Sequence, residues 1–415
     1  MAMFLKSCSI IFAVIAVGLT YIFYTPLPDD AVEPWKQLLG RSLCRIVFGS
    51  ANIAELLGYN GVNTIRSLGD GSQEITPDED LEISDAKFNG VDVRIYKPKN
   101  IDYNNPGLVY LHGGGWTIGT IGSYDPLVKK IAKSSRFVVV SVGYRRAPEH
   151  VFPAAFDDCL TATRYFFKNA KQYSVDPTRI GISGDSAGGN LAAAVTLKLS
   201  KDADPNIKPK AQVLIYPALQ ALDLNLPSYR RYNDDGGPFI LAKPMMTKFW
   251  LYYGEGNLKL LQQFLENNQF ISEIKNTKFY SYIDRKQLPE KYLTEEDKSP
   301  FSTNGNKELF DRVSKWLLDP HFAPLLATDE DLKKLPPTYI LTAEYDPLRD
   351  DGFLLTSRLR SLNKEVVHSH FDGVQHAFVA LTFLESYGRA VDDITKFLDN
   401  YVLHDMDMIK MNLGI

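Results

Sequence analysis

Cysteine is scarce in this sequence, and its few cysteines form no repeated pattern. The 415 residues contain three, Cys8, Cys44 and Cys159, and none of them belongs to a Cys-x-x-Cys pair. A disulfide framework or a structural zinc site needs paired ligands, so neither is expected and no metal is predicted. One Cys44–Cys159 bridge stays open, because pairing cannot be read from sequence.

An excess of basic charge is also missing. Lysine and arginine number 46 against 50 aspartates and glutamates, which gives a net charge of −4. No basic block stands out from this balance, so nucleic-acid binding is not expected. Hydrophobic residues make up 45% of the chain, enough for the core of one large α/β domain or of two modest ones.

Charge and proline are absent from one long apolar stretch near the amino terminus, residues 7–24. Its length approaches the roughly 20 residues that span a bilayer. A lysine precedes the stretch and acidic residues follow it, and positive charge stays on the cytosolic side. We therefore expect a cytosolic tail at 1–6, a transmembrane signal anchor at 7–24, and the rest of the chain, 25–415, on the lumenal or outer side. A cleaved signal peptide is the alternative, although such peptides usually end in small residues.

Short apolar runs alternate with helical stretches through most of the chain. Two alternating segments around Asn89-Gly90 predict a hairpin. Six later runs are typical of strands buried on both faces of a parallel sheet, at residues 107–112, 137–144, 179–184, 211–217, 338–343 and 365–371. Helices are expected up to about residue 60 and at 123–133, 152–171, 188–201, 352–362 and 378–403. This alternation predicts an α/β fold with a mostly parallel sheet led by an antiparallel hairpin.

One interval, residues 218–335, contains no clear core strand and is rich in aromatics and prolines. It could be a helical insertion that only enlarges the core, or a lid over a site, since long insertions in compact domains often bind ligands. We expect this interval and residues 27–80 to form a cap that covers the site with an apolar pocket.

The motif Gly-x-Ser-x-Gly stands between an expected strand and an expected helix. It reads Gly184, Asp185, Ser186, Ala187 and Gly188. This context is the one that a nucleophile elbow requires, with the serine on a tight strand-to-helix turn and glycines where backbone segments approach closely. Ser186 is therefore the candidate nucleophile, and we interpret Asp185 as local scaffolding.

Three consecutive glycines follow the first expected parallel strand, in the segment His112, Gly113, Gly114 and Gly115. Acyl transfer creates an oxyanion, which preorganised backbone N–H groups stabilise. Such donors come from the residue after the nucleophile, here Ala187, and from a loop of this His-Gly-Gly-Gly type. We predict Gly113 and Gly114 as the loop donors, with His112 and Gly115 shaping the loop.

A serine nucleophile needs a base and an acid that orients the base, which follow it in the order acid, then histidine. Asp346 lies in the loop after the expected strand at 338–343, and His376 lies just past the strand at 365–371. Asp350 and Asp351 compete with Asp346, but their position at a helix start favours N-terminal capping. His368 and His370 alternate within a strand, so a structural role is favoured for both.

These motifs resemble the hormone-sensitive-lipase branch of the α/β-hydrolases, the "GDXG" lipolytic enzymes, through the segments HGGGW, YRRAPEH, GDSAGGN and DPLRDDG. Further segments, such as YTPLPDDAVEPWK, resemble the arylacetamide deacetylase family over nearly the whole chain. The resemblance implies a type II endoplasmic reticulum membrane enzyme with a lumenal catalytic domain. It also implies hydrolysis of small aryl acetamides and hydrophobic esters by Ser186, Asp346 and His376, without a cofactor.

Two other functions stay open at this point. One is hydrolysis of neutral lipid, either triacylglycerol or cholesteryl ester, by the same machinery. The other is a receptor for a small apolar ligand that keeps the hydrolase fold without its chemistry, because fold does not guarantee function. Retention of the serine, acid, histidine and glycine loop favours an enzyme.

Overall fold

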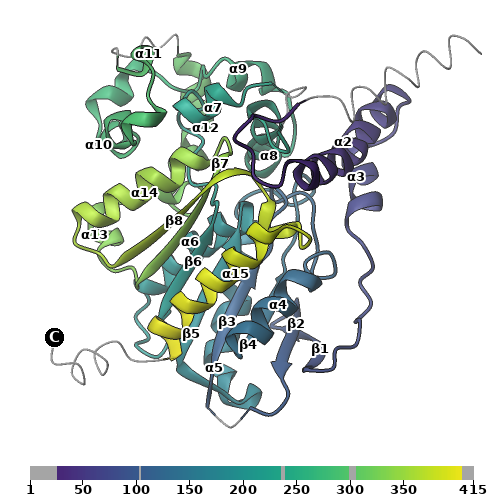
Figure 1. Ribbon diagram of the computed structural model, residues 1–415. Coiled ribbons are helices and arrows are strands. Elements are labelled where there is room, and N and C mark those ends of the chain that lie inside the picture. The colour runs from purple at the N-terminus through teal and green to yellow at the C-terminus, as the bar shows by residue number, and fades with distance from the viewer. Residues whose placement is uncertain (1–25, 102–103, 235–238, 299–304, 404–415) are drawn as a thin grey trace, which may run out of the picture.

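One mixed sheet of eight strands lies at the centre of the computed structural model (Figure 1), which describes residues 26–101, 104–234, 239–298 and 305–403. The strand order is β1-β2-β4-β3-β5-β6-β7-β8, with β1, β2 and β4 antiparallel and the remaining pairs parallel. The strands are β1 (Leu81–Phe88), β2 (Val91–Pro98), β3 (Asn105–Leu111), β4 (Val138–Gly143), β5 (Val175–Asp185), β6 (Ala211–Ile215), β7 (Thr338–Tyr345) and β8 (Val366–Gln375). The predicted fold class is confirmed.

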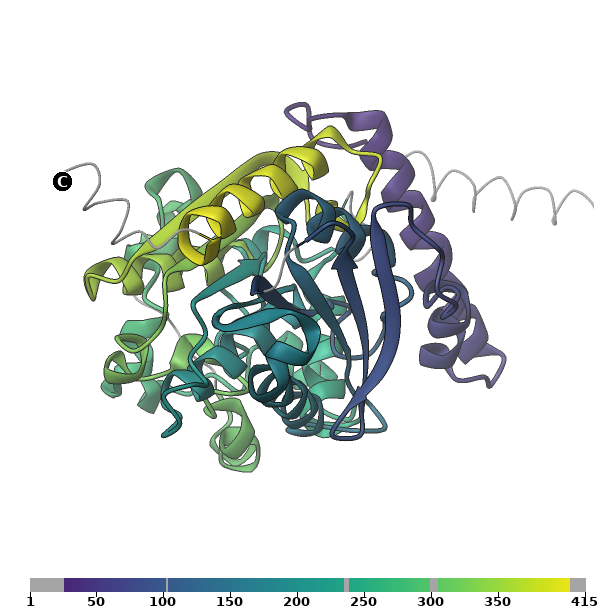
Figure 2. The ribbon, with the colours of Figure 1, turned by 90° about the horizontal axis from the view of Figure 1, so that it is seen from below.

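Helices cover both faces of this sheet and build a separate layer beside its carboxyl edge. They are α2 (Pro34–Leu56), α3 (Gly61–Gly69), α4 (Asp125–Ser135), α5 (Ala154–Asn169), α6 (Ala187–Ser200), α7 (Pro227–Arg231), α8 (Lys243–Glu255), α9 (Leu261–Leu265), α10 (Lys278–Tyr282), α11 (Glu295–Lys298), α12 (Lys307–Leu317), α13 (Asp329–Leu332), α14 (Arg349–Ser361) and α15 (Glu385–Leu398). Figure 2, seen from below, shows the sheet between its two helical layers.

Alternating side chains of the central strands divide the core in two. In β3, Val109 and Leu111 join a cluster with α5, α6 and α14, whereas Leu108 and Tyr110 join a cluster with α4 and α15. Successive strand side chains point to opposite faces, so a strand covered on both faces must be apolar at nearly every position. This explains the continuous apolar runs of β3 to β7. The expectation is wrong for β8, an edge strand whose first half is only partly buried.

The hairpin at the start of the sheet forms where it was predicted. Phe88 pairs with Val91, and the two turn residues, Asn89 and Gly90, have φ values of 49° and 90°. A two-residue turn with both φ values positive matches the twist of the flanking strands, and Asn-Gly is the preferred pair for it. The hairpin extends the parallel sheet at its β4 edge.

The helix expected at 378–403 is interrupted. A short 3-10 turn covers Phe378–Ala380, and α15 begins only at Glu385. The reason lies far away in the chain, because the carboxylate of Glu33 accepts hydrogen bonds from the backbone N–H groups of Glu385 and Ser386 at 2.8 and 3.1 Å. These N–H groups are unpaired donors at a helix start. Glu33 therefore caps α15 from outside it.

The segment before α2 is joined to the end of β8 as well. The N–H of Val32 and the side-chain amide of Gln37 both donate to the carbonyl oxygen of Gly373, at 3.0 and 2.7 Å. The hydroxyl of Tyr345 donates to Asp30. We call residues 30–37 the linker clamp, since it ties the start of α2 to the backbone just before His376.

The linker clamp supports a prediction for the variant Glu33→Gln. Burial alone would raise the pKa of Glu33, but hydrogen bonds from Glu385, Lys36 and Ser386 outweigh it and lower the pKa to about 2. The ionised carboxylate therefore stabilises the fold fully above its ordinary pKa near 4.5, and this stabilisation is lost as the pH falls from there towards 2. We expect Glu33→Gln to cost about 1 kcal/mol at pH 7, as for loss of a helix cap.

Urea unfolding of the variant and of the unsubstituted chain, at pH 7 and at pH 3, tests this. The difference in unfolding free energy should shrink at pH 3, because the unfolded chain, with its ordinary pKa near 4.5, then binds a proton at Glu33 that the folded chain largely does not. An equal difference at both pH values would contradict the capping role.

The proposed anchor at 7–24 and the tail at 1–6 lie outside the described residues. Among residues 26–403, apart from the short undescribed gaps, no helix is long and apolar enough to cross a membrane.

Candidate active site

The predicted catalytic side chains all follow the carboxyl ends of parallel strands. Ser186 follows β5, Asp346 follows β7 and His376 follows β8, whereas the glycine loop follows β3. The carboxyl ends of parallel strands meet at one edge of a sheet, which is where open α/β sheets bind their ligands. Four segments distant in sequence therefore meet at one place.

Ser186, His376 and Asp346 form a continuous hydrogen-bonded line. The Nε2 atom of His376 lies 2.9 Å from the Oγ of Ser186, and its Nδ1 atom lies 2.7 Å from Oδ2 of Asp346. All three side chains are buried. The other carboxylate oxygen of Asp346 accepts the N–H of Leu348 at 2.8 Å, which fixes the plane of the carboxylate.

The turn at Ser186 has the strained backbone of a nucleophile elbow, with φ 55° and ψ −118°. Its flanking glycines are sterically required, because a Cβ on Gly184 would lie 2.2 Å from the carbonyl oxygen of Gly188. A Cβ on Gly188 would lie 2.0 Å from that of Leu111. Strand, turn and helix are packed backbone to backbone here. The reason predicted for the two glycines, close backbone approach, agrees with this geometry.

The backbone N–H groups that are free in the glycine loop are not the ones that were predicted. The N–H of Gly113 donates to Oδ1 of Asp185 at 2.9 Å, so the prediction that Gly113 faces an oxyanion is wrong in this structure. Gly114 and Gly115 instead line the cavity beside Ser186. Within the described residues, their N–H groups have no hydrogen-bond acceptor. Ala187, as the first residue of α6, also has an N–H without an intrahelical partner.

Each glycine of the loop is needed for a different steric reason. A Cβ on Gly113 would lie 2.4 Å from a carboxylate oxygen of Asp185, and one on Gly114 would lie 2.2 Å from the carbonyl oxygen of Ile118. At Gly115 it would lie 2.2 Å from the ring of Phe249 in α8. The loop thus packs against the nucleophile elbow, against its own later residues at Ile118, and against α8 of the cap.

Asp185 holds the loop and the elbow together. Besides the Gly113 amide, its carboxylate accepts the hydroxyls of Tyr110 and Tyr124 at 2.8 and 2.9 Å. Burial raises the pKa of Asp185 to about 6, although these three donors favour the ionised form. The scaffolding role interpreted from sequence agrees with these contacts. The two tyrosines were not anticipated, because no local pattern marks a partner on another strand or helix.

His112 supports the same loop from behind. Its ring stacks on Tyr144 at 4.3 Å between centroids, and the tyrosine hydroxyl donates to the carbonyl oxygen of His112 at 2.8 Å. Burial lowers the pKa of His112 to about 4, so the ring is neutral at pH 7. These contacts agree with a role in shaping the loop.

The competing acids do not cap α14, which corrects the prediction for them. The helix already begins at Arg349. From its first turn, Asp350 accepts the N–H of Ser228 at 2.7 Å and Asp351 accepts that of Leu219 at 2.8 Å. Both carboxylates are fully buried and tie α14 to the chain after β6.

The strand histidines contact structural partners rather than the nucleophile. His368 and His370 both lie within hydrogen-bond distance of the Thr342 hydroxyl, at 2.9 and 2.8 Å. Cys44 and Cys159 are free, so the bridge left open by the sequence does not form. Cys44 instead lines the cavity beside Ser186.

An apolar cavity of about 430 Å³ opens above Ser186 and His376. Its volume lies within the usual range for sites that enclose small organic ligands. The apolar walls come from α2–α3 and from α8 with the residues before it: Leu43, Val47, Phe48, Ile65, Ile240, Leu241, Met245, Met246 and Phe249. Both expected cap segments therefore contribute to the cover over the serine.

The contribution of 218–335 is narrower than expected. No residue of α9 to α13 lines this cavity. These helices pack elsewhere, for example where Arg358 of α14 pairs with Asp329 of α13. Among the described residues of this interval, the stretch around α8 acts as cover and the other helices enlarge the core.

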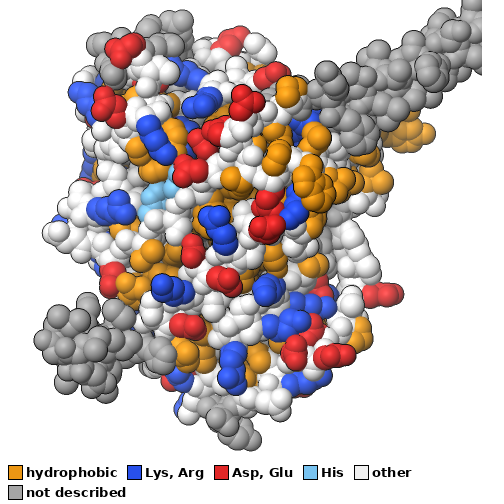
Figure 3. Space-filling view, in the orientation of Figure 1, with side chains coloured by type: hydrophobic (Ala, Val, Ile, Leu, Met, Phe, Trp, Pro, Cys, Tyr) orange, Lys and Arg blue, Asp and Glu red, His pale blue; other side chains and the backbone are white. Residues whose placement is uncertain are grey.

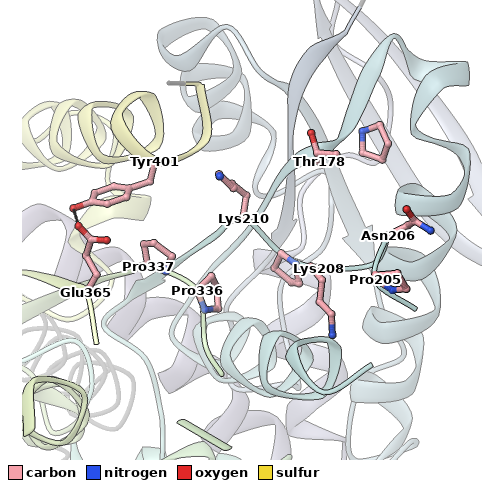
Figure 4. Close-up of a pocket in the computed structure, with 11 residues that line it drawn as sticks. Thr178, Pro205, Asn206, Lys208, Lys210, Pro336, Pro337, Glu365 and Tyr401 are labelled. Atoms are coloured by element: carbon pink, nitrogen blue, oxygen red, sulfur yellow. Dashed lines mark hydrogen bonds between the residues drawn. The ribbon is translucent and has the colours of Figure 1, made fainter. Parts of the chain in front are cut away.

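A second hollow lies at the opposite, amino-terminal end of the strands (Figure 4). Prolines and lysines dominate its lining, and the hydroxyl of Tyr401 donates to Glu365 across one side at 2.8 Å. Its lining contains no serine or histidine. The combination of nucleophile, base and apolar pocket therefore occurs in the cavity at the carboxyl edge.

Comparisons with known proteins agree with this geometry. A family model described as the alpha/beta hydrolase fold matches residues 108–269 and 280–380. An arylacetamide deacetylase from Bos taurus is 39% identical over 396 residues, covering 93% of this chain and 97% of that protein. Neutral cholesterol ester hydrolase 1 from Bos taurus is 36% identical over 388 residues, covering 91% and 94%.

Solved structures of esterases are similar as well. The Pyrobaculum calidifontis esterase has a TM-score of 0.59 and 28% identity, covering 82% of this chain and 92% of its own. A thermostable esterase from Pseudomonas putida has a TM-score of 0.62 and 23% identity, covering 86% and 96%. The second likeness concerns the fold alone.

Proposed function

Because the chain belongs to the α/β-hydrolase fold family, we propose that it is a serine hydrolase in which Ser186, His376 and Asp346 carry the chemistry. The observation that carries the proposal is the unbroken contact from Ser186 Oγ through His376 to Asp346. In this arrangement the imidazole can accept the serine proton while the carboxylate holds the ring in the correct tautomer.

The reaction follows from these contacts in two halves. Ser186 Oγ attacks the carbonyl carbon of an ester or amide as Nε2 of His376 takes its proton, and the imidazolium then protonates the leaving alcohol or amine. A water molecule, deprotonated by the same nitrogen, attacks the acyl carbon. The bond from that carbon to Ser186 Oγ then breaks as the imidazolium returns the proton to Oγ, which releases the acid and restores the enzyme. Asp346 stabilises the imidazolium in both halves.

The oxyanion of each tetrahedral intermediate needs N–H donors beside the serine. Gly114, Gly115 and Ala187 are the candidates, because the Gly113 amide is already bound to Asp185. Preorganised donors of this kind contribute about 10²- to 10³-fold to kcat.

The apolar walls favour hydrophobic esters and aryl acetamides as substrates. A relative named arylacetamide deacetylase, matched over nearly its full length, supports this class. Neutral lipid hydrolysis is the second candidate, supported by the relative named neutral cholesterol ester hydrolase 1 and by the apolar cavity. A panel of aryl acetamides, short esters and cholesteryl esters, assayed on the full chain, separates the two.

Fluorophosphonate labelling tests whether the fold is catalytic at all. An activated serine forms a covalent adduct with the probe, whereas a receptor that had lost its chemistry would not. We expect labelling at Ser186, identified by mass spectrometry. An unlabelled protein that also fails to hydrolyse p-nitrophenyl acetate would support the receptor alternative.

Asp185→Asn should show how much the loop depends on its anchor. The carboxylate holds the Gly113 amide, and a hydrogen bond to a charged group contributes about 1.5–3 kcal/mol. We expect kcat to fall by about 10- to 100-fold with KM nearly unchanged, since the loop loosens but the apolar walls stay. Tyr110→Phe, which removes only one of the other donors to Asp185, is the matched control and should change kcat less.

The N-terminal segment completes the proposal. Residues 7–24 act as a signal anchor that places the catalytic domain in the lumen of the endoplasmic reticulum, as a single-pass type II protein. The apolar length and the flanking charges support this orientation. Protease protection in intact microsomes tests it, because a lumenal domain should be digested only after the membrane is opened.

A further inference from the structure

Helix α2 presents an apolar face to solvent. Its large exposed side chains repeat at intervals of three, four or seven residues and therefore lie on one side of the helix. They are Trp35, Leu39, Leu43, Ile46 and Ile53, with Leu57 just beyond, and they are 40–70% exposed: 67%, 45%, 51%, 47%, 61% and 69%. Figure 3 shows apolar side chains gathered at the upper right, over α2. We call this set the α2 face.

The charges of α2 are placed the opposite way from those of an ordinary surface helix. A helix on a soluble protein turns its charged side outwards and buries its apolar stripe. In α2, Arg41 is fully buried, Lys36 pairs with Glu33, and Glu55 is the one charged side chain of this helix that is largely exposed. An apolar exterior of this length, about 34 Å for 23 residues, marks a surface that contacts another apolar phase.

Aromatic residues stand at both ends of the α2 face. Trp35 lies in its first turn, and Tyr59 lies just past its end with 69% of its surface exposed. Tryptophan and tyrosine favour the boundary between lipid headgroups and acyl chains, because they combine an apolar ring with a polar atom. Aromatics at both ends suit a helix lying along such a boundary.

The α2 face continues into the catalytic cavity. Leu43 is half exposed and also lines the cavity, together with Val47 and Phe48 from the same helix. An apolar molecule at the α2 face would therefore reach the space above Ser186 without crossing a polar rim on the α2 side. The apolar run at 7–24 ends ten positions before α2 begins, a distance of at most about 35 Å of extended chain.

We propose that the α2 face is a lipid-binding surface. Through this face α2 lies in the headgroup region of a bilayer, and hydrophobic substrate passes from there into the cavity. Lipid fits better than a second copy of the chain. The face has aromatics at both ends, and α2 begins ten positions after a segment long enough to span a membrane. The part of this proposal that concerns substrate entry rests on the proposed hydrolase function.

Fluorescence quenching tests the contact with lipid, using the full chain in phosphatidylcholine vesicles that carry doxyl-labelled acyl chains. The chain has four tryptophans, so quenching is measured against Trp35→Phe. The signal that this variant loses reports the start of α2, and the signal that Trp35→Phe, Leu57→Trp regains reports its end. We expect comparable quenching at both positions, because the helix lies flat. Quenching at 35 alone would mean that an anchored chain holds α2 away from the bilayer, and would overturn the proposal.

A second copy of the chain would give a different pattern. Absence of lipid quenching at both positions, together with cross-linking between two copies carrying Ile53→Cys, would overturn the proposal in favour of a dimer. Neither measurement depends on hydrolysis, so both stand even if the proposed function fails.

The activity of a charged variant tests substrate entry. We expect Ile46→Asp with Ile53→Asp to lower hydrolysis of a long-chain ester embedded in vesicles by about 10-fold or more, since charge replaces apolar contact area. The same variant should hydrolyse dissolved p-nitrophenyl acetate at the unsubstituted rate. Val151→Asp with Val367→Asp, at exposed apolar positions outside α2, is the matched control and should change neither rate. Equal losses on both esters, or no loss on either, would overturn the role in entry.

Discussion

Replacing Ser186 with alanine should lower kcat on p-nitrophenyl acetate by about a million-fold, to the residual rate that binding and oxyanion contacts alone provide. The variant removes the hydroxyl placed to attack, since Oγ of Ser186 is the oxygen hydrogen-bonded to Nε2 of His376. The side chain is small and buried at a turn fixed by backbone contacts, so the fold should persist. Single-turnover and steady-state assays on purified protein measure the change.

Ser183→Ala provides the matched control for that experiment. Ser183 is fully buried three positions earlier on β5, and its hydroxyl is not the one hydrogen-bonded to Nε2 of His376. Its variant should keep the unsubstituted rate and the labelling by fluorophosphonate. If Ser186→Ala kept a rate within about tenfold of the unsubstituted chain, the assignment of the nucleophile would be wrong.

Asp346→Asn should lower kcat by about 10⁴-fold, although it changes neither size nor shape. One oxygen of Asp346 accepts the Leu348 N–H, so the asparagine keeps its oxygen there and turns its NH₂ group towards Nδ1 of His376. The imidazole must then carry its proton on Nε2, the nitrogen that should receive the proton of Ser186. The base is present in the wrong tautomer.

Nitrogen NMR of labelled His376 distinguishes this mechanism from simple loosening of the site, because it reports which ring nitrogen carries the proton. Asp372→Asn is the control: Asp372 lies four positions before His376, is exposed, and pairs with Lys291 and His370. It should leave both the tautomer and kcat unchanged. A slow Asp346→Asn variant with the original tautomer would contradict the account.

The positions of the catalytic groups could be predicted because each depends on local sequence. A serine between two glycines after a strand, and an acid and a histidine after two later strands, are brought to one edge by parallel pairing alone. The hairpin at Asn89-Gly90 is of the same kind, since two residues determine its turn.

Other features could not be predicted because distant parts of the chain determine them. Gly113 was predicted to donate to the oxyanion, but its N–H donates instead to Asp185, 72 residues away. The local sequence around Asp350 and Asp351 is typical of helix caps, yet their carboxylates accept hydrogen bonds from backbone N–H groups in the chain after β6. The start of α15 depends on Glu33 at the other end of the chain. A sequence pattern within one segment cannot reveal contacts with residues in a distant segment.

The extent of the cap was overestimated for a related reason. An aromatic-rich interval without strands looks the same in sequence whether it covers a site or fills a core. Only packing separates the α8 region, which faces Ser186, from the helices that follow it.

The linker clamp has a mechanical consequence. Val32 and Gln37 share the carbonyl of Gly373, three residues before the imidazole of His376. Tension applied at the amino terminus would therefore act, through these two hydrogen bonds, on the last residues of β8, which lead directly to His376. An attachment at the first residues of this protein would therefore be mechanically coupled to the segment that carries His376, its proton acceptor.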